Sequence, residues 1–225
     1  MRRVMIGTPS DDGRVEVLYT DSLVRTIKAC LAEQIEILPV FIPYDAMIQR
    51  VRNELLDIAV QGKVDDLIFI DADQCWEPGD VLKLLSYPVD CVGAAVRKKD
   101  DSTEHYNVSA NATIPIDPQT GLLMPNSVGT GFIRLSRKAM QALWETSKPY
   151  TNGNKQGRWV FEIGLINNEL HSEDVIMCLK LRSLGIPVHL DPSINPGHIG
   201  PKVFKGDFNS FLQRKQQEAN QQRSA

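Results

Sequence analysis

The sequence predicts an α/β fold in which a mostly parallel sheet carries helices on both faces. Its first hundred residues alternate short β-rich runs with helical patterns, which is typical of repeated strand–helix–strand units. Residues 67–70 are apolar at every position, as expected of a central strand covered on both faces. With 225 residues, of which 42% are hydrophobic and 24% charged, the chain has the composition of a soluble globular protein with one full core.

The N-terminal half supplies most of this pattern. We expect strands at residues 4–6, 35–42, 66–70 and 91–96, and helices at residues 17–32, 45–61 and 79–85. In the second of these helices, apolar residues recur at helical spacing, with Asp45 as the expected N-cap and Gly62 at the end. This half is predicted to form a Rossmann-like nucleotide-binding sheet.

The alternation is interrupted after Lys99. Residues 112–125 are predicted to form a hairpin around the turn at 117–121. The pattern then predicts a strand at 131–135, a helix at 136–145, a helix at 172–184 capped by Ser172 and ended by Gly185, and a strand at 187–190. The Gly- and Asn-rich stretch 151–157 is expected to be a mobile loop that could act as a lid.

No linker marks a second independent domain. We therefore expect one domain over residues 1–208, with halves at 1–100 and 101–208, followed by a polar tail at 209–225. From Gln213 onward the tail is rich in Gln, Arg and Lys, and we expect a frayed helix or disorder there.

Charge and cysteine usage exclude several classes of function. The net charge of -3 and the pI near 5.8 argue against the broad positive field of nonspecific nucleic-acid binders. Cys30, Cys75, Cys91 and Cys178 form no close pair, so neither a disulfide framework nor a thiolate metal site is expected. The N-terminus lacks a signal-peptide core, and no window approaches the roughly 18 apolar residues of a spanning helix, so we expect a cytoplasmic location without membrane insertion.

The strongest local signal is Asp71-Ala72-Asp73, which directly follows the apolar strand at 66–70. Ligands of open α/β sheets bind at the carboxyl edge of the strands, where these carboxylates emerge. Residues two apart on an extended segment point to the same side, so Asp71 and Asp73 could bind one divalent cation, or one of them could bind a sugar hydroxyl. Hard oxygen ligands favour magnesium or manganese.

Other polar groups are expected at the same edge. Thr8 and Pro9 end the first strand, but the chain contains neither a P-loop nor a G-x-G-x-x-G fingerprint. Arg50 and Asn53 share a helix face and could hold a diphosphate, although the arginines at 50 and 52 could equally be solvated. Arg97, Lys98 and Lys99 follow the strand at 91–96 and could face phosphate, a sugar or water.

The C-terminal half adds a third set of candidates. Glu173 and Asp174 open a helix, where the dipole favours anions and could alone explain them. His198 lies between glycines in a loop and could complete a metal shell. Gly129-Thr130-Gly131, Lys202 and Lys205 are expected to converge on the same cleft.

These blocks resemble, in their order, a GT-A-fold, metal-dependent nucleotide-sugar glycosyltransferase, particularly the small soluble type of bacteriophages and large DNA viruses. The resemblance covers most of residues 1–205. It implies a UDP-sugar donor held by Mn²⁺ or Mg²⁺, a small mixed acceptor-side region in the half at 101–208 and, for a viral enzyme, a location in the host cytoplasm.

The resemblance also implies roles for single residues. Thr8 and Pro9 would line the uracil pocket, Arg50 and Asn53 would contact the nucleotide, Asp71 would touch ribose or sugar, and Asp73 and His198, with Asp71, would bind the metal. The donor site would further include Ala72, Arg97, Lys98, Gly129, Thr130, Gly131, Lys202 and Lys205. The cation would stabilise the departing diphosphate.

The catalytic carboxylate is expected among Asp174 and Glu173. In an inverting reaction Asp174 would deprotonate the acceptor hydroxyl, whereas in a retaining reaction either residue would position the acceptor or stabilise an oxocarbenium-like centre. We favour Asp174 as the base. The alternatives from other classes are a nucleotidyltransferase, which would release pyrophosphate, and a non-catalytic sugar-nucleotide-binding module.

Two classes of acceptor fit the sequence. A viral relative could glycosylate a hydroxymethylated pyrimidine in DNA, bound by a basic rim of Arg97, Lys98, Lys99, Lys202, Lys205, Arg214 and Lys215. The negative net charge does not favour DNA, and a glycan or a protein side chain is the rival acceptor.

Overall fold

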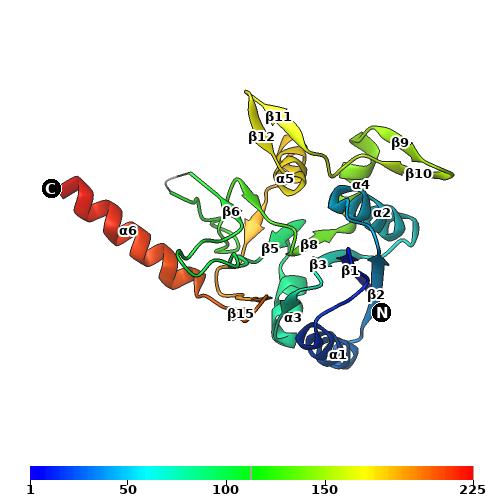
Figure 1. The fold of residues 1–225 in the computed structure, drawn as a ribbon, viewed down its shortest axis with the longest axis horizontal. Helices are drawn as coiled ribbons and strands as arrows, with labels where there is room; N and C mark the ends of the chain where they lie inside the picture. The colour runs from blue at the N-terminus through cyan, green and yellow to red at the C-terminus, as the bar shows by residue number, and fades with distance from the viewer. Residues whose placement is uncertain (112, 225) are drawn as a thin grey trace.

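A six-stranded sheet in the order β13-β5-β8-β3-β1-β2 forms the centre of the molecule (Figure 1). The structure, a computed structural model, describes residues 1–111 and 113–224. The six strands are β1 (Arg2–Ser10), β2 (Ile35–Pro43), β3 (Asp66–Ile70), β5 (Cys91–Gly93), β8 (Phe132–Ser136) and β13 (His189–Leu190). All neighbours pair in parallel except β8, which runs antiparallel between β3 and β5. The predicted α/β fold class with a mostly parallel sheet is confirmed.

Helices cover both faces of this sheet (Figure 1). One layer contains α2 (Ile48–Gln61), α4 (Arg137–Thr146) and α5 (Glu173–Ser183), and the other contains α1 (Val17–Ala32) and α3 (Pro78–Ser86). Leu67 and Phe69 of β3 pack into the first layer, whereas Ile68 and Ile70 pack into the second. A strand buried on both faces cannot show polar alternation, which explains why β3 is apolar from Leu67 to Ile70.

Smaller sheets and strand pairs lie outside the central sheet. A three-stranded sheet contains β4 (Gln74–Cys75), β14 (Gly197–Ile199) and β15 (Val203–Phe204). Three antiparallel pairs follow: β6 (Val108–Ser109) with β7 (Ser127–Val128), β9 (Pro149–Asn152) with β10 (Lys155–Arg158), and β11 (Gly164–Ile166) with β12 (Glu169–His171). The last helix, α6 (Phe208–Ser224), extends away from the body of the molecule (Figure 1).

Two N-terminal predictions require correction. The second helix begins at Ile48 with Met47 at its N-cap, not at Asp45. The Asp45 carboxylate instead accepts hydrogen bonds from the backbone N–H of Met47 and the guanidinium of Arg50. The strand predicted to reach Val96 ends at Gly93. After Gly93 the chain leaves the sheet, and the N–H of Val96 donates to the side chain of Asn107 instead of to a neighbouring strand.

The C-terminal half differs more from its sequence pattern. The predicted mobile loop at 151–157 is the β9–β10 hairpin, and the β11–β12 hairpin was not predicted. The last predicted strand, at 187–190, is shortened to β13, and the tail after Gln213 is helical through Ser224. Residue 112, at the start of the hairpin predicted at 112–125, lies outside the described residues; within that hairpin, Ile116 and Leu123 form an antiparallel bridge. Among the helices that the structure describes, none is long and apolar enough to cross a membrane.

Candidate functional site

Two adjoining cavities open at the carboxyl edge of the sheet. The larger has a volume of about 730 Å³ and lies where β1 and β3 end, and the smaller, of about 260 Å³, lies beside the segment 129–131 and the start of α5. Asp71 and His198 line both cavities. The position agrees with the rule that open α/β sheets bind ligands beyond the carboxyl ends of their strands.

Asp71, Ala72 and Asp73 follow β3 and line the larger cavity, as their position in the sequence predicts. Their backbone is fixed on both sides, because Asp71 N–H donates to Gly131 O at 3.2 Å and its own carbonyl accepts from Gln74 N–H at 3.1 Å. The two carboxylates have different partners. One is held by an arginine and the other by a lysine and a histidine.

Asp73 contacts Lys99 and His198. Its Oδ2 lies 2.6 Å from Lys99 Nζ and 3.3 Å from His198 Nε2. Burial opposes ionisation of Asp73, but the contacts with His198, when that ring is protonated, and with Lys99 outweigh it and lower the pKa of this carboxyl to about 2. Asp73 is therefore ionised at neutral pH.

The tautomer of His198 follows from its second contact. Its Nδ1 lies 2.8 Å from the carbonyl oxygen of Arg97, and because a carbonyl can only accept, Nδ1 must carry a proton. In the neutral ring Nε2 is then a lone-pair acceptor that faces the Asp73 carboxylate. Two acceptors at 3.3 Å repel one another unless Nε2 is protonated or a cation lies between them.

This pair of acceptors fits one edge of a divalent-metal shell. Ligands about 2.1 Å from Mg²⁺ or a similar ion, at right angles, stand about 3.0 Å apart, close to the observed separation. Among the residues that the structure describes, no three His, Cys, Asp or Glu side chains form a complete metal cage. Asp73 and His198 would therefore supply two ligands, and a bound substrate and water would supply the rest.

Asp71 belongs instead to a buried ion network centred on Arg52. The Nη2 of Arg52 donates to Asp71 Oδ1 at 2.9 Å, and its Nη1 donates to the carboxylate of Glu173. Arg52 is 5% exposed and Glu173 is 8% exposed. One guanidinium therefore joins Asp71, the residue after β3, to the first turn of α5.

The sequence prediction placed Arg50 and Asn53 at the nucleotide, but their observed contacts lie elsewhere. Arg50 pairs with Asp45. Asn53 is fully buried, and its amide bonds the backbone of Val160 and Phe161. Sequence reasoning missed Arg52, although its spacing from the core residues of α2 was a usable signal.

Glu173 and Asp174 differ in availability. Both line the smaller cavity, but the Glu173 carboxylate is bound to Arg52. Asp174 Oδ1 accepts from the hydroxyl of Ser172 and from the backbone N–H of Val175. Ser172, at the N-cap of α5, makes no capping bond to the backbone, because its hydroxyl is directed to Asp174. Of the two carboxylates, only Asp174 lacks a cationic partner among the described residues.

Gly129, Thr130 and Gly131 form a wall of the smaller cavity. A Cβ at position 129 would lie 2.2 Å from Asn107 Nδ2, and one at position 131 would lie 3.0 Å from Asp71 Oδ2. The glycines thus let the backbone approach the side chains that organise the site. Lys98 and Arg97 line the same cavity, as expected from their position after β5.

Unused hydrogen-bonding capacity is concentrated at the smaller cavity. Among the described residues, six buried side-chain atoms have no hydrogen-bond partner, and four of them belong to residues that line this cavity. These atoms are Arg52 Nε, Gln74 Oε1, Arg97 Nε and Thr130 Oγ1. Unpaired buried polar groups are costly, so this concentration is suited to a ligand rich in hydroxyl groups.

Besides Arg50 and Asn53, three further predicted donor-site residues lie away from the two cavities. Thr8 is fully buried and its hydroxyl bonds that of Tyr19, whereas its neighbour Pro9 does line the larger cavity. Lys202 pairs with Asp101, and Lys205 lines a separate cleft. The cations that do line the larger cavity are Arg14 and Lys99.

The larger cavity is acidic. Six carboxylates line it, against the two cations Arg14 and Lys99 and the imidazole of His198. The carboxylates are those of Asp11, Asp12, Glu16, Asp45, Asp71 and Asp73. A diphosphate would be repelled here unless a divalent cation entered with it.

Comparison with known proteins supports the fold. No protein-family model and no curated protein matches the chain. Among solved structures, A197 from STIV matches with a TM-score of 0.55 and 15% sequence identity, over 93% of this chain and 91% of that one. The likeness extends over nearly the whole chain and supports a Rossmann-like GT-A fold.

Two further solved structures are more distant. A glycosyltransferase involved in glycosylation of the major capsid of PBCV-1 matches with a TM-score of 0.35 and 9% identity, over 61% of this chain and 62% of that one. A mannose-1-phosphate geranyltransferase from Thermus thermophilus matches with a TM-score of 0.43 and 10% identity, over 65% of this chain and 61% of that one. At these TM-scores neither likeness supports an argument about this chain.

Proposed function

We propose that the protein is a glycosyltransferase that moves a sugar from a UDP-sugar to an acceptor hydroxyl with the help of Mn²⁺ or Mg²⁺. The observation that carries the proposal is the pair of cavities that meet at Asp71 and His198. The larger would hold the nucleoside diphosphate and the smaller the sugar. The unpaired polar atoms of Gln74 and Thr130 beside the smaller cavity support this division.

Asp73 and His198 would hold the metal ion, on the evidence of their facing acceptor atoms. When bound, the ion supplies Lewis-acid stabilisation of the leaving diphosphate. Lys99, which pairs with Asp73 at 2.6 Å, would turn from that carboxylate toward the phosphates. Since Lys99 is a point charge on a flexible stem, this exchange requires no backbone movement.

Asp174 is the proposed general base. It lines the smaller cavity without a cationic partner among the described residues, whereas Glu173 is neutralised by Arg52. In an inverting reaction the acceptor hydroxyl would give its proton to Asp174 as its oxygen bonds to the anomeric carbon. The bond from that carbon to the diphosphate oxygen breaks in the same step, and UDP leaves. Arg52 is a positioning residue, since it fixes Asp71 and α5 relative to one another.

The proposal is tested by measuring UDP release from a panel of UDP-sugars, with and without Mn²⁺. We expect slow metal-dependent hydrolysis of one donor, reduced about 100-fold in Asp73→Asn. The matched control is Asp101→Asn, because this exposed carboxylate lines neither cavity. Absence of both UDP release and donor binding with every sugar would refute the proposal. Release of pyrophosphate when UTP and a sugar 1-phosphate are supplied instead would replace it by nucleotidyl transfer.

The acceptor is proposed in two classes, a hydroxymethylated pyrimidine in DNA and a glycan or protein hydroxyl. Of the seven cations that would form a basic rim, four are paired with carboxylates: Lys99 with Asp73, Lys202 with Asp101, Arg214 with Glu104 and Lys215 with Glu218. Affinity for hydroxymethylated duplex that falls steeply with salt would support DNA, because bound phosphates release counterions. Salt-insensitive affinity would favour the glycan or protein.

A further inference from the structure

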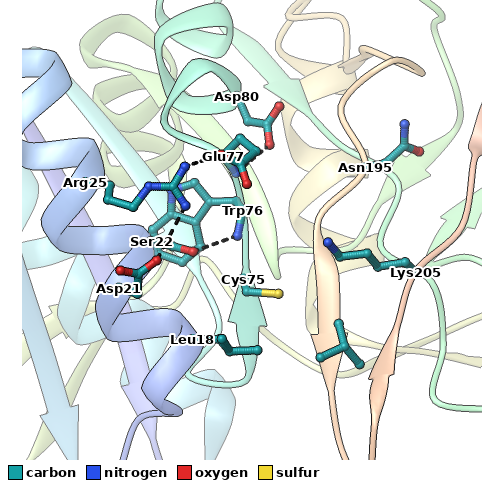
Figure 2. A pocket seen from close by; sticks show the side chains of 11 residues that line it. Leu18, Asp21, Ser22, Arg25, Cys75, Trp76, Glu77, Asp80, Asn195 and Lys205 are labelled. Carbon is teal, nitrogen blue, oxygen red and sulfur yellow. Dashed lines mark hydrogen bonds and ion pairs between the residues drawn. The ribbon is translucent and has the colours of Figure 1, made fainter.

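A third cleft lies behind the three-stranded sheet that carries His198. It has a volume of about 250 Å³ and is bounded by α1, the start of α3 and the β14–β15 hairpin (Figure 2). Cys75 lines this cleft, whereas its neighbour Gln74 in β4 lines the smaller cavity of the candidate site. Because successive side chains of a strand point to opposite faces, the cleft and the smaller cavity lie on opposite sides of β4.

The carboxylates on one wall of this cleft are already satisfied. Asp21 and Glu77 both pair with Arg25 (Figure 2). Asp80 and Glu77 form a reciprocal capping box at the start of α3. Each carboxylate of this wall therefore has a hydrogen-bond partner on the wall itself, although the wall holds one cation for three carboxylates.

The opposite wall carries an uncompensated cation. Lys205 makes no ion pair among the residues that the structure describes, and its side chain points across the cleft toward that of Cys75 (Figure 2). Asn195 on the same wall is occupied, since its amide donates to Ser193 O and accepts from Phe208 N–H. Lys205 is thus the group that remains available to a ligand.

The apolar part of the cleft lining consists of Leu18, Trp76 and Val203. Trp76 is 4% exposed, and its indole N–H is turned away to the hydroxyl of Thr26 at 2.8 Å. Gly197 keeps the space open, because a Cβ there would lie 2.6 Å from Cys75 Sγ. The volume is below the roughly 300–1,000 Å³ of sites for drug-sized ligands, so the occupant would be small.

We infer that this cleft is a second binding site, for a small anion with an apolar body, such as an aromatic carboxylate. The carboxylate would pair with Lys205, and the ring would lie against Leu18, Trp76 and Val203. This inference does not depend on the proposed function, since none of these residues lines the two cavities of the candidate site.

The labelling rate of the Cys75 thiol can report on charge and ligand binding in the cleft. Cys30, Cys91 and Cys178 are buried, whereas Cys75 is partly exposed in the cleft. Methanethiosulfonate reagents convert a thiolate to a mixed disulfide and release methanesulfinate, and they are made with either a negative sulfonate or a positive trimethylammonium group. We expect the negative reagent to label Cys75 about tenfold faster than the positive one, after each rate is divided by that for 2-mercaptoethanol. Benzoate should slow the labelling, and benzyl alcohol should not.

Two variants make the test specific. Lys205→Gln should bring the two labelling rates together and remove the protection by benzoate. Lys202→Gln should change neither, because Lys202 lies on the same hairpin but pairs with Asp101. Equal rates for the two reagents in the wild type, or a preference that survives in Lys205→Gln, would overturn the inference.

A ligand or label in the cleft should also change the geometry of the metal site on the other face of the three-stranded sheet. Gly197 pairs with Cys75 and His198 pairs with Gln74, so a displacement of β14 against β4 moves His198 relative to Asp73. If the proposed metal site is correct, the wild type labelled at Cys75 should bind Mn²⁺ several-fold more weakly than the unlabelled protein in a spectroscopic titration. Equal Mn²⁺ affinity before and after labelling would refute this coupling, whereas absence of Mn²⁺ binding in both would count against the proposed function.

Discussion

The buried guanidinium of Arg52 is the residue on which the arrangement of the candidate site most depends. It is 5% exposed and bonds the carboxylates of Asp71 and Glu173, which come from different parts of the chain. The buried Glu173 carboxylate would be costly to bury without this partner, whereas Asp71 remains partly exposed. The network therefore links the stability of the fold to the geometry of the site.

Replacing Arg52 by methionine should destabilise the protein strongly. The change leaves two carboxylates without their cation, and breaking a buried pair in this way costs about 3–5 kcal/mol in the free energy of unfolding. Arg50→Met is the matched control, because Arg50 pairs with Asp45 at the surface and should cost much less. Urea denaturation of both variants measures the difference, and equal losses would contradict the network.

Substitution of Asp174 should affect turnover, whereas substitution of Glu173 should affect stability. We expect Asp174→Asn to lower the rate of donor turnover by about 10²–10⁴-fold while the donor Kd stays near that of the wild type, because only proton transfer is lost. Glu173→Gln should instead lower the free energy of unfolding, since it breaks the bond to Arg52. Near-wild-type turnover in Asp174→Asn would remove this residue from the catalytic list.

The sequence contains part of the information that distinguishes the two arginines. Arg52 is four residues from Ile48 and from Leu56, so it lies near the apolar face of α2, whereas Arg50 does not. A charge in an apolar helix face is usually assigned to solvent. The partner that makes its burial possible, Glu173, is 121 residues away, and no local pattern predicts that contact.

At the scale of elements, α2 contacts the chain from the last turn of α4 through β10 to the segment before α5. Asn53 bonds the backbone at 160–161, Glu54 pairs with Lys155, and Asp57 accepts from the indole N–H of Trp144 at 2.6 Å. A Cβ on Gly157 would lie 2.3 Å from Asp57 Oδ2, so the hairpin can approach α2 only with glycine there. The stretch at 151–157 is therefore an ordered hairpin anchored to α2.

This anchor predicts a pH dependence of stability. Burial raises the pKa of Asp57 to about 6, assisted by the charge of Glu54 and opposed by Trp144 and Arg158. The folded state therefore holds more protons than the unfolded state between about pH 4 and pH 6, so this contribution to stability is lost as the pH rises through that window.

Asp57→Asn isolates this contribution. The amide oxygen can still accept from Trp144, but the side chain no longer ionises. Relative to the wild type, the variant should gain about 2 kcal/mol in the free energy of unfolding between pH 4 and pH 7, measured by urea denaturation at each pH. A difference that stays constant across this range would show that Asp57 does not titrate as the structure implies.

The elements that the sequence predicted well are those with strong periodicity. The helix at 17–32 and the strand at 66–70 have the predicted bounds, because their apolar residues repeat over several turns or fill every position. The β11–β12 hairpin was missed, although Asn167 and Asn168, with φ of 51° and 67°, provide the signal of a tight hairpin turn. Its strands of three residues are too short to show alternation.

At the scale of the whole molecule, topology brings the candidate residues together. Asp71 and His198 lie 127 positions apart in the chain, and they meet because β4 pairs with β14 beside the carboxyl end of β3. The order of the blocks in the sequence predicted one cleft for most of them. The antiparallel position of β8 and the separate cleft of Lys205 depend on long-range pairing, which the sequence does not contain locally.

The acidic lining of the larger cavity predicts a strong dependence on metal. Of the six carboxylates, three have a cationic partner among the described residues and three do not, so the lining stays negative. UDP should therefore bind weakly alone and at least tenfold more tightly with Mn²⁺. Calorimetric titration of UDP with and without Mn²⁺ measures the ratio. Asp73→Asn should reduce the gain from Mn²⁺, and an equal affinity under both conditions would argue against a metal at this cavity.

Glycosyl transfer breaks the bond between sugar and diphosphate. Phosphorus NMR follows this directly, since UDP, UMP and a sugar phosphate give distinct signals as a UDP-sugar is consumed in the presence of Mn²⁺. We predict that the donor signals are replaced by those of UDP alone, in the wild type and not in Asp73→Asn. Appearance of UMP together with a sugar phosphate would place bond breaking inside the diphosphate and contradict glycosyl transfer.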